Sequence, residues 1–268
     1  MSSPWDKARR PAPAAVAPEA DTGGDEQRLY GINAIRALFA RRPQALRKLY
    51  LSEARVPELR EILKWCATHR VGYRVVEEDD LRRLAASSHH EGVVADVLRA
   101  PMPRLDAWLP ALPPGPCCVL WLDGVGNPHN LGAILRSAAN FGVAGVIVPA
   151  HASLQVSGAA ARVAEGGAER VPLVRADGGS DPFAALRAAG FTPVATLVHG
   201  GDDVFADPLP ARVVYVMGAE QAGMDRGLAA SCDRRISIPG TGAVESLNVA
   251  TATGVLLAEW FRQHRASR

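Results

Sequence analysis

From Cys117 to the C-terminus, the sequence predicts an α/β domain built on a mainly parallel sheet, with a smaller α/β unit before it. Short apolar runs alternate with segments whose apolar residues recur at helical spacing, an order typical of parallel sheets covered on both faces. Residues 101–116 are rich in proline and separate the two units as a linker. With 268 residues, 48% of them hydrophobic, the chain is large enough to bury two cores.

The chain before residue 101 divides into a tail and a compact unit. Residues 1–27 hold proline, alanine, glycine and charged residues but almost no large apolar ones, so we expect a disordered tail. Residues 28–100 form the small α/β unit. Its expected helices cover Ile32 to Phe39, Leu59 to Cys66 and Leu81 to Leu84, and its expected strands are 49–51, 73–76 and 93–98.

Residues 117–268 carry the regular alternation of strands and helices. The expected strands are 117–122, 144–148, 171–174, 193–198, 212–217 and 235–238, and the expected helices are 130–141, 153–165, 182–189, 225–231 and 246–264. Ligand sites in such sheets lie beyond the carboxyl ends of the strands. The loops after residues 122, 198, 217 and 238 are therefore the places to look for chemistry.

Composition excludes several classes of protein but selects none. The net charge of +2 does not by itself indicate a nucleic-acid binder, although only three of the 30 basic residues are lysine and arginine suits bidentate phosphate contacts. The four cysteines form no Cys-x-x-Cys pair and indicate core thiols in a reducing cytosol. His89 and His90 lack a second ligand cluster, so we expect no metal. No membrane span or signal core is evident, and we expect a cytoplasmic protein.

The first stretch with chemical character follows the strand 117–122. Gly124 and Gly126 suggest a dinucleotide loop, but the third glycine of that fingerprint is missing. Asn130 stands where a helix N-cap belongs, and Gly132 inside the helix suggests that something packs or binds closely there. Arg136 lies off the apolar stripe of this helix, so it either serves a site or faces solvent on an ordinary capped helix.

Two further stretches follow strands near the C-terminus. The strand 212–217 ends at Gly218, which allows close backbone approach, and Glu220 follows at the mouth of the sheet as a site carboxylate or a solvated loop charge. The strand 235–238 stops at Pro239, and a glycine loop leads to the last helix. We expect Ser246 to cap that helix and Asn248 to lie in its first turn, where asparagine is unfavourable without a partner.

Taken together, these stretches resemble the motifs of the SpoU/TrmH family of RNA ribose methyltransferases, in the SPOUT superfamily. The resemblance covers roughly residues 29–264, and three motifs agreeing in order are far more specific than any one. The matching segments are Asn130-x-Gly132-x-x-x-Arg136, Gly218-x-Glu220-x-x-Gly223, Ile238-Pro through Ser246-Leu247-Asn248, Glu165-Gly-Gly-Ala-Glu-Arg-Val-Pro172, and upstream Tyr30-Gly-Ile-Asn-Ala-Ile and His90-Glu-Gly-Val-Val-Ala, which are similar to the ends of a small RNA-substrate-binding domain.

The resemblance implies a C-terminal SPOUT domain with a deep trefoil knot and a homodimer in which each pocket lies near the partner. It implies S-adenosylmethionine as cofactor, held by Thr196, Met217, Gly218, Ile238 and Leu247. Ala219 and Gly240 depart from the asparagine and methionine common in the family, which affects side-chain details. An RNA substrate is implied too, large-subunit ribosomal RNA before transfer RNA.

The implied catalytic residues are Arg136, Asn130, Glu220, Ser246 and Asn248. In the family the counterpart of Arg136 is proposed as the base for the ribose 2′-hydroxyl, yet guanidinium groups titrate above about pH 12, so clamping a phosphate and stabilising an alkoxide is the easier role. His129 is a candidate substrate contact, and the arginines of helix 36–42 with Arg47 are candidates for phosphate contacts. The alternatives are a non-catalytic RNA-binding member of the fold and a nicotinamide-dependent oxidoreductase.

Overall fold

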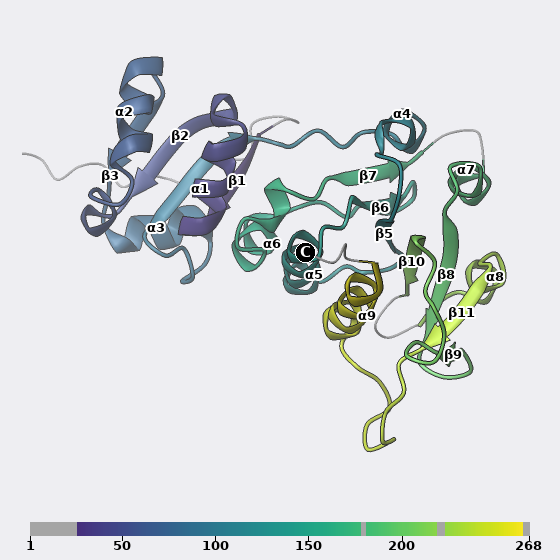
Figure 1. Ribbon diagram of the computed structural model, residues 1–268. Coiled ribbons are helices and arrows are strands. Elements are labelled where there is room, and N and C mark those ends of the chain that lie inside the picture. Colours follow the sequence, from purple (N-terminus) through teal and green to yellow (C-terminus); the bar gives the residue numbers. More distant parts are fainter. Residues whose placement is uncertain (1–25, 178–180, 219–222, 265–268) are drawn as a thin grey trace, which may run out of the picture.

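The computed structural model describes residues 26–177, 181–218 and 223–264, which form two sheets with their covering helices (Figure 1). In the first unit the strands are β1 (Glu26–Tyr30), β2 (Leu46–Leu51), β3 (Gly72–Val75) and β4 (Val93–Leu98), and the helices are α1 (Ile32–Arg41), α2 (Arg60–His69) and α3 (Glu78–Ala85). Their sheet has the order β1-β4-β2-β3. Strand β4 is antiparallel to both of its neighbours, whereas β3 runs parallel to β2.

Both faces of this small sheet are covered because its strands carry apolar residues on each side. Helices α1 and α2 place Ile35, Leu38 and Ile62 in one core with the strand residues Leu49 and Val97. Helix α3 packs Leu81 and Leu84 on the opposite face, against Tyr30 and Tyr50. The predicted helices and strands are therefore present, and β1, which pattern alone did not indicate, closes the sheet.

The second unit contains a seven-stranded sheet in which every recorded pairing is parallel, as expected. The order is β7-β6-β5-β10-β8-β11-β9. The strands are β5 (Cys117–Leu122), β6 (Gly145–Pro149), β7 (Leu173–Ala176), β8 (Thr192–Leu197), β9 (Asp202–Asp203), β10 (Arg212–Met217) and β11 (Arg234–Ser237); the helices are α4 (Leu105–Trp108), α5 (Pro128–Asn140), α6 (Gly158–Val163), α7 (Pro182–Ala188), α8 (Arg226–Ala230) and α9 (Val249–His264).

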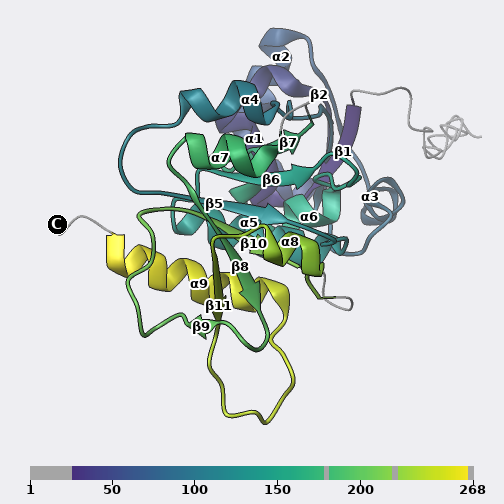
Figure 2. The same cartoon turned by 90° about the vertical axis from the view of Figure 1, so that its right-hand side faces the viewer.

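Helices cover this sheet on both faces (Figure 2). Leu131 and Leu135 of α5 and Leu256 of α9 belong to the core on one face. Phe183 and Leu186 of α7 belong to the core on the other face. None of the helices within the described parts of the chain has the length and apolar character needed to cross a bilayer. The knot implied by the family resemblance stays a prediction.

The structure corrects several expectations. The proline-rich segment 101–116 is not a bare linker, because it forms α4 and a 3₁₀ turn at Leu109–Ala111 that bury Leu105 and Leu109 in the second core. The helix expected over 153–165 is confined to α6, which starts after Ser157, whose side chain caps it by accepting a hydrogen bond from the backbone of Ala160. Leu154 precedes the helix and packs against the core. The expected tail, residues 1–27, reaches into β1, and its first 25 residues lie outside the described chain.

Both predicted N-caps at the site are also wrong. Helix α5 is capped by Asn127, whose side chain accepts a hydrogen bond from the backbone of His129, and Pro128 occupies the first helical position. Asn130 therefore lies inside the first turn. At α9 the side chain of Asn248 accepts hydrogen bonds from the backbone of the second and third residues that follow, so it takes the capping position expected for Ser246.

Candidate active site

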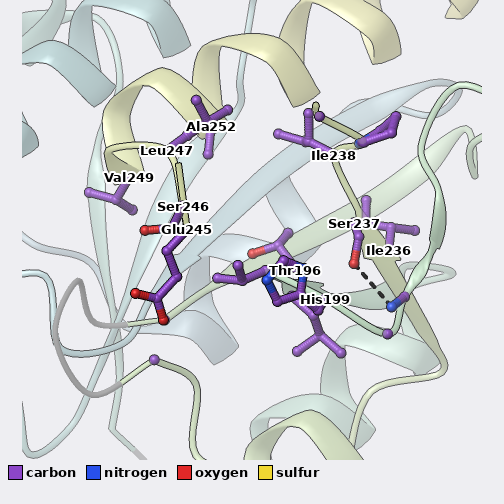
Figure 3. Close-up of a pocket in the computed structure, with 18 of the residues that line it drawn as sticks. Thr196, His199, Ile236, Ser237, Ile238, Glu245, Ser246, Leu247, Val249 and Ala252 are labelled. Atoms are coloured by element: carbon purple, nitrogen blue, oxygen red, sulfur yellow. Dashed lines mark hydrogen bonds between the residues drawn. The ribbon is translucent and has the colours of Figure 1, made fainter. Parts of the chain in front are cut away.

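A cavity of about 770 Å³ lies beyond the carboxyl ends of β8, β10 and β11. The segment between β11 and α9 forms one wall; the strand ends, the residues that follow β8 and β10, and one face of α9 form the rest (Figure 3). The sequence-predicted cofactor residues that line it are Thr196, Met217, Gly218, Ile238 and Leu247, together with the predicted catalytic residues Ser246 and Asn248. Seven of the ten predicted site residues therefore meet at one place.

Backbone crowding positions the floor of the cavity. A Cβ atom added to Gly218 would lie 2.7 Å from the backbone nitrogen of Met224 and 2.9 Å from the carbonyl carbon of Gly223. Real Cβ atoms do not approach backbone that closely, so the chain can return past the end of β10 only because residue 218 has no side chain. The close backbone approach predicted at Gly218 is confirmed.

The hydroxyl of Thr196 is already oriented by the protein. Its Oγ1 donates a hydrogen bond of 2.8 Å to the carbonyl oxygen of Val216, on the adjacent strand β10. A hydroxyl has a single proton, so Thr196 has only acceptor capacity left for a ligand. The side chain of Ser237 is fixed in a related way, since it accepts a hydrogen bond from the backbone of Gly201.

The wall between β11 and α9 is a long exposed segment. Residues 239–248 are all exposed, and Gly242 has a φ of 78°, in the left-handed region that favours glycine. Val244 and Leu247 are 70% and 45% exposed although both line the cavity. The segment ends at Asn248, which begins α9.

Asn248 connects this wall to the helix that carries the first motif. Its Nδ2 donates a hydrogen bond of 3.1 Å to Oδ1 of Asn130, across 118 positions of sequence. Because the Oδ1 of Asn248 accepts from the first turn of α9, the same side chain caps one helix and holds a residue of another. The two predicted catalytic asparagines are thus adjacent.

The other predicted catalytic residues lie differently. Arg136 is exposed on α5, six residues or about 9 Å of helix beyond Asn130, and it is not among the residues that line the cavity. It lies off the buried stripe of α5, as its position in the sequence predicted. Glu220 and Ala219 lie outside the described residues. His129 is exposed in the first turn of α5.

The ionisable side chains among the described lining residues are His199, Asp203 and Glu245, and none of these was predicted. Figure 3 shows His199 with Thr196 between the wall at Glu245 to Val249 and the strand residues Ile236 to Ile238. The signal that could have found His199 is its place after a buried strand and before Gly200 and Gly201. Arginine and lysine are absent from this described lining.

Gly132 has a structural reason that does not involve a ligand. A Cβ atom there would lie 2.6 Å from the carbonyl oxygen of Ala160 and 2.7 Å from Cβ of Val163, both in α6. The close packing that the sequence suggested at Gly132 is therefore packing between α5 and α6.

Two family models match the chain. Residues 118–258 match the SpoU rRNA Methylase family, and residues 28–103 match a model described as RNA 2'-O ribose methyltransferase substrate binding. The chain is 39% identical, over 98% of its length and 81% of that protein, to an uncharacterized tRNA/rRNA methyltransferase, YfiF, of Escherichia coli O157:H7. It is 34% identical, over 89% of its length and 92% of that protein, to the 23S rRNA (guanosine-2'-O-)-methyltransferase RlmB of Nitrosomonas europaea.

Solved structures agree with the sequence comparisons. The SpoU methyltransferase AviRb from Streptomyces viridochromogenes, in complex with AdoMet, superposes with a TM-score of 0.73 at 30% identity, covering 89% of this chain and 90% of that one. An AdoMet-bound rRNA methyltransferase from Sinorhizobium meliloti gives 0.74 at 27% identity, covering 90% and 88%. A chain whose two units match the two family models, and whose fold matches these enzymes over nearly its whole described length, belongs to the SpoU rRNA methylase family.

Proposed function

We propose that this chain is an S-adenosylmethionine-dependent enzyme that methylates a ribose 2′-hydroxyl in structured RNA. The observation that carries the proposal is the convergence of Thr196, Gly218, Ile238 and Leu247 on one cavity, with Asn248 at its edge bonded to Asn130. Residues from three separate motifs, 118 positions apart at the extremes, have no shared packing reason to meet at a strand-end cavity.

The cavity suits S-adenosylmethionine in size and chemistry. Its volume of about 770 Å³ is within the range of small-molecule sites. Ile238, Leu247 and Met217 offer apolar surface for a purine, while Asp203 and Glu245 can accept hydrogen bonds from ribose hydroxyls or an ammonium group. The described lining has no cationic side chain to neutralise a pyrophosphate, which disfavours the nicotinamide alternative.

The residues around the cavity need only orient the acceptor ribose and assist the loss of the proton from its 2′-hydroxyl. When bound, S-adenosylmethionine supplies a methyl group already activated by its sulfonium. Asn130 and Asn248 hold each other at the cavity edge, where their amides can orient a ribose. Holding a hydroxyl in line with a reactive centre is worth roughly 7–11 kcal/mol in ideal cases. We assign Arg136 the binding of the substrate phosphate and the stabilisation of the developing alkoxide.

We propose large-subunit ribosomal RNA as the substrate, with transfer RNA as the alternative. The names of the relatives support an RNA of one of these kinds, and residues 28–103 match a substrate-binding model. Because the enzyme must meet such an RNA, we also propose that the protein is located in the cytoplasm. Mapping 2′-O-methyl positions in the RNA of a deletion strain, with and without the restored gene, tests this. If every ribose methylation of both RNAs persists in the deletion strain, the proposal is refuted.

We also propose a homodimer. Val244 and Leu247 are exposed beside the cavity and Phe261 is exposed on α9, where its ring packs at a tilt against Phe141 of α5 with ring centroids 5.7 Å apart. An exposed Arg136 that does not line its own cavity is consistent with a second copy beside it. Sedimentation equilibrium at micromolar concentration should give twice the chain mass of 28.4 kDa, and a monomer there would contradict the proposal.

The division of labour is tested with Arg136→Ala. We expect methyl transfer to unmodified RNA to fall below detection while S-adenosylmethionine affinity, measured by calorimetry, changes less than about twofold, because Arg136 does not line the cavity. Arg187→Ala, in α7, is the matched control and should leave both unchanged. Loss of cofactor binding in Arg136→Ala would show that the arginine belongs to the cofactor site.

A further inference from the structure

Residues 158–169 lie between the helix that carries Arg136 and the N-terminal unit. They comprise α6 and the 3₁₀ turn Gly167–Glu169, and we call them the spacer. Figure 1 shows α6 between α5 and β1. The spacer includes most of the Glu165 motif, which the cavity does not use.

On one side the spacer rests directly on the backbone of α5. A Cβ atom at Gly167 would lie 2.6 Å from the carbonyl oxygen of Leu135 and 3.1 Å from Cα of Arg136. One turn earlier, Gly132 has the same relation to Ala160 of the spacer. At Gly167 the neighbouring atoms of α5 all belong to its backbone, so no rotation of a side chain would let the spacer move closer to Arg136.

On its other side the spacer packs against the N-terminal unit with small residues. A Cβ atom at Gly158 would lie 2.8 Å from the carbonyl oxygen of Arg28 and 2.7 Å from the ring of Tyr30. Ala161 is buried in the core that Ile35 and Leu38 form. The N-terminal unit is therefore closely packed against the catalytic unit.

Two ion pairs fix the orientation of this contact. Arg42 makes two hydrogen bonds of 2.7 Å to Glu169, with the two side chains only 15% and 9% exposed. Arg162 donates to Glu91 at 3.1 Å, and the other oxygen of Glu91 accepts from the backbone of Ile32 at the start of α1. A bidentate pair restricts angle as well as distance. Each pair joins one unit to the other.

We propose that the spacer sets the position of the substrate-binding unit relative to Arg136, with Arg42–Glu169 and Arg162–Glu91 as positioning contacts; this rests on the proposed function. An RNA held by the N-terminal unit presents its target ribose to the catalytic unit at an effective concentration that depends on the geometry between the two units. Fixing that geometry raises the fraction of bound RNA whose ribose reaches the cavity.

The test breaks both ion pairs while keeping their shapes. Glu169→Gln keeps the side-chain size, and Arg162→Met keeps the apolar stem that touches Gly31. With saturating long RNA, the single-turnover rate of the double variant should fall about tenfold, while half-saturation by RNA and cofactor affinity stay within about twofold. A short oligonucleotide that spans only the target site should react at the wild-type rate.

Asp233→Asn is the control, because it removes the Arg187–Asp233 pair inside the catalytic unit. It should leave the rates on both RNAs unchanged. Equal slowing on long and short RNA would mean that the ion pairs only support folding, and unchanged rates on both would overturn the inference. If the wild-type protein methylates neither RNA, the proposed function fails, and the role of the ion pairs in orienting the two units is then tested by energy transfer alone.

Orientation can be read without activity. The four cysteines are buried, so thiol dyes will label cysteines introduced at the exposed Ser88 and Ala230, one in each unit. Energy transfer between the dyes should report a narrow distance distribution in the otherwise wild-type protein and a broader one in the double variant. Equal widths would refute the proposed role of the ion pairs.

Discussion

The glycine at the end of β10 offers the sharpest test of the cavity. In Gly218→Ala the new methyl carbon would lie 2.7 and 2.8 Å from N and Cα of Met224, whereas carbon contacts are comfortable at about 3.5 Å or more. The backbone must retreat by about 0.7 Å, since no side-chain rotation relieves the clash. The segment that retreats is the one that lines the cavity at Gly223 and Met224.

Forced displacements of packed atoms cost roughly 1–3 kcal/mol. The free protein can relieve this strain by moving the segment, and cofactor binding must then push the segment back and pay the same cost. The affinity for S-adenosylmethionine therefore falls by roughly 5- to 150-fold. Calorimetric titration with S-adenosylmethionine measures the loss. Gly240→Ala is the control, because residue 240 also lines the cavity but a Cβ atom there meets nothing within 4 Å. Equal affinities of the two variants would refute the reasoning.

Three further predictions concern stability and the site. Gly132→Ala should destabilise the fold by about 1–3 kcal/mol, whereas Gly254→Ala, whose Cβ meets no atom within 4 Å, should stabilise it by up to about 1 kcal/mol; denaturant unfolding with the same sign for both would contradict the packing. Asn248→Ala should cost about 1 kcal/mol as a lost cap and stop methyl transfer while cofactor binding persists, since it also releases Asn130; full activity in the transfer assay would oppose the assignment. Hydrogen bonds from Arg262 and Gln263 lower the pKa of Glu259 from its ordinary 4.5 to about 2, so the stabilisation from its charged form is complete above pH 4.5 and is lost as the pH falls toward 2. Thermal melting temperatures of Glu259→Gln and wild type should therefore differ at pH 6 and converge at low pH. A difference that stays constant with pH would exclude this cause.

The strands of the large sheet were largely predictable. The expected strands 117–122 and 212–217 coincide with β5 and β10, because a strand covered on both faces needs a continuous apolar run: six residues in β5, and the five that follow Arg212 in β10. Helix starts were less predictable. Two asparagines could cap α5, and Pro128, which suits the first helical position, decided for Asn127. Ser246 and Asn248 compete in the same way, and Leu247 belongs to the cavity wall rather than to the stripe of α9.

The cavity was predictable only through motifs. The predicted strand ends at residues 198, 217 and 238 indicated the right edge of the sheet, yet no periodicity relates Asn248 to Asn130. His199 could have been suspected from its place between a buried strand and Gly200, whereas Glu245 lies in a long loop in which nothing in the sequence marks it as a cavity residue. The proline-rich segment misled for a related reason, since Leu105 and Leu109 find their core only when the sheet exists.

The order of the strands also governs how the chain can assemble as it is made. Strand β5 pairs with β6 on one edge, but its other edge stays unpaired until β10 has been synthesised. The pairing of β5 with β10 places Cys117 opposite Arg212, 95 residues later. At 5–20 residues per second that edge stays open for roughly 5–20 s of synthesis. An apolar, unpaired strand edge invites pairing with other chains. Nascent chains stalled between β7 and β10 should therefore be the most dependent on chaperones.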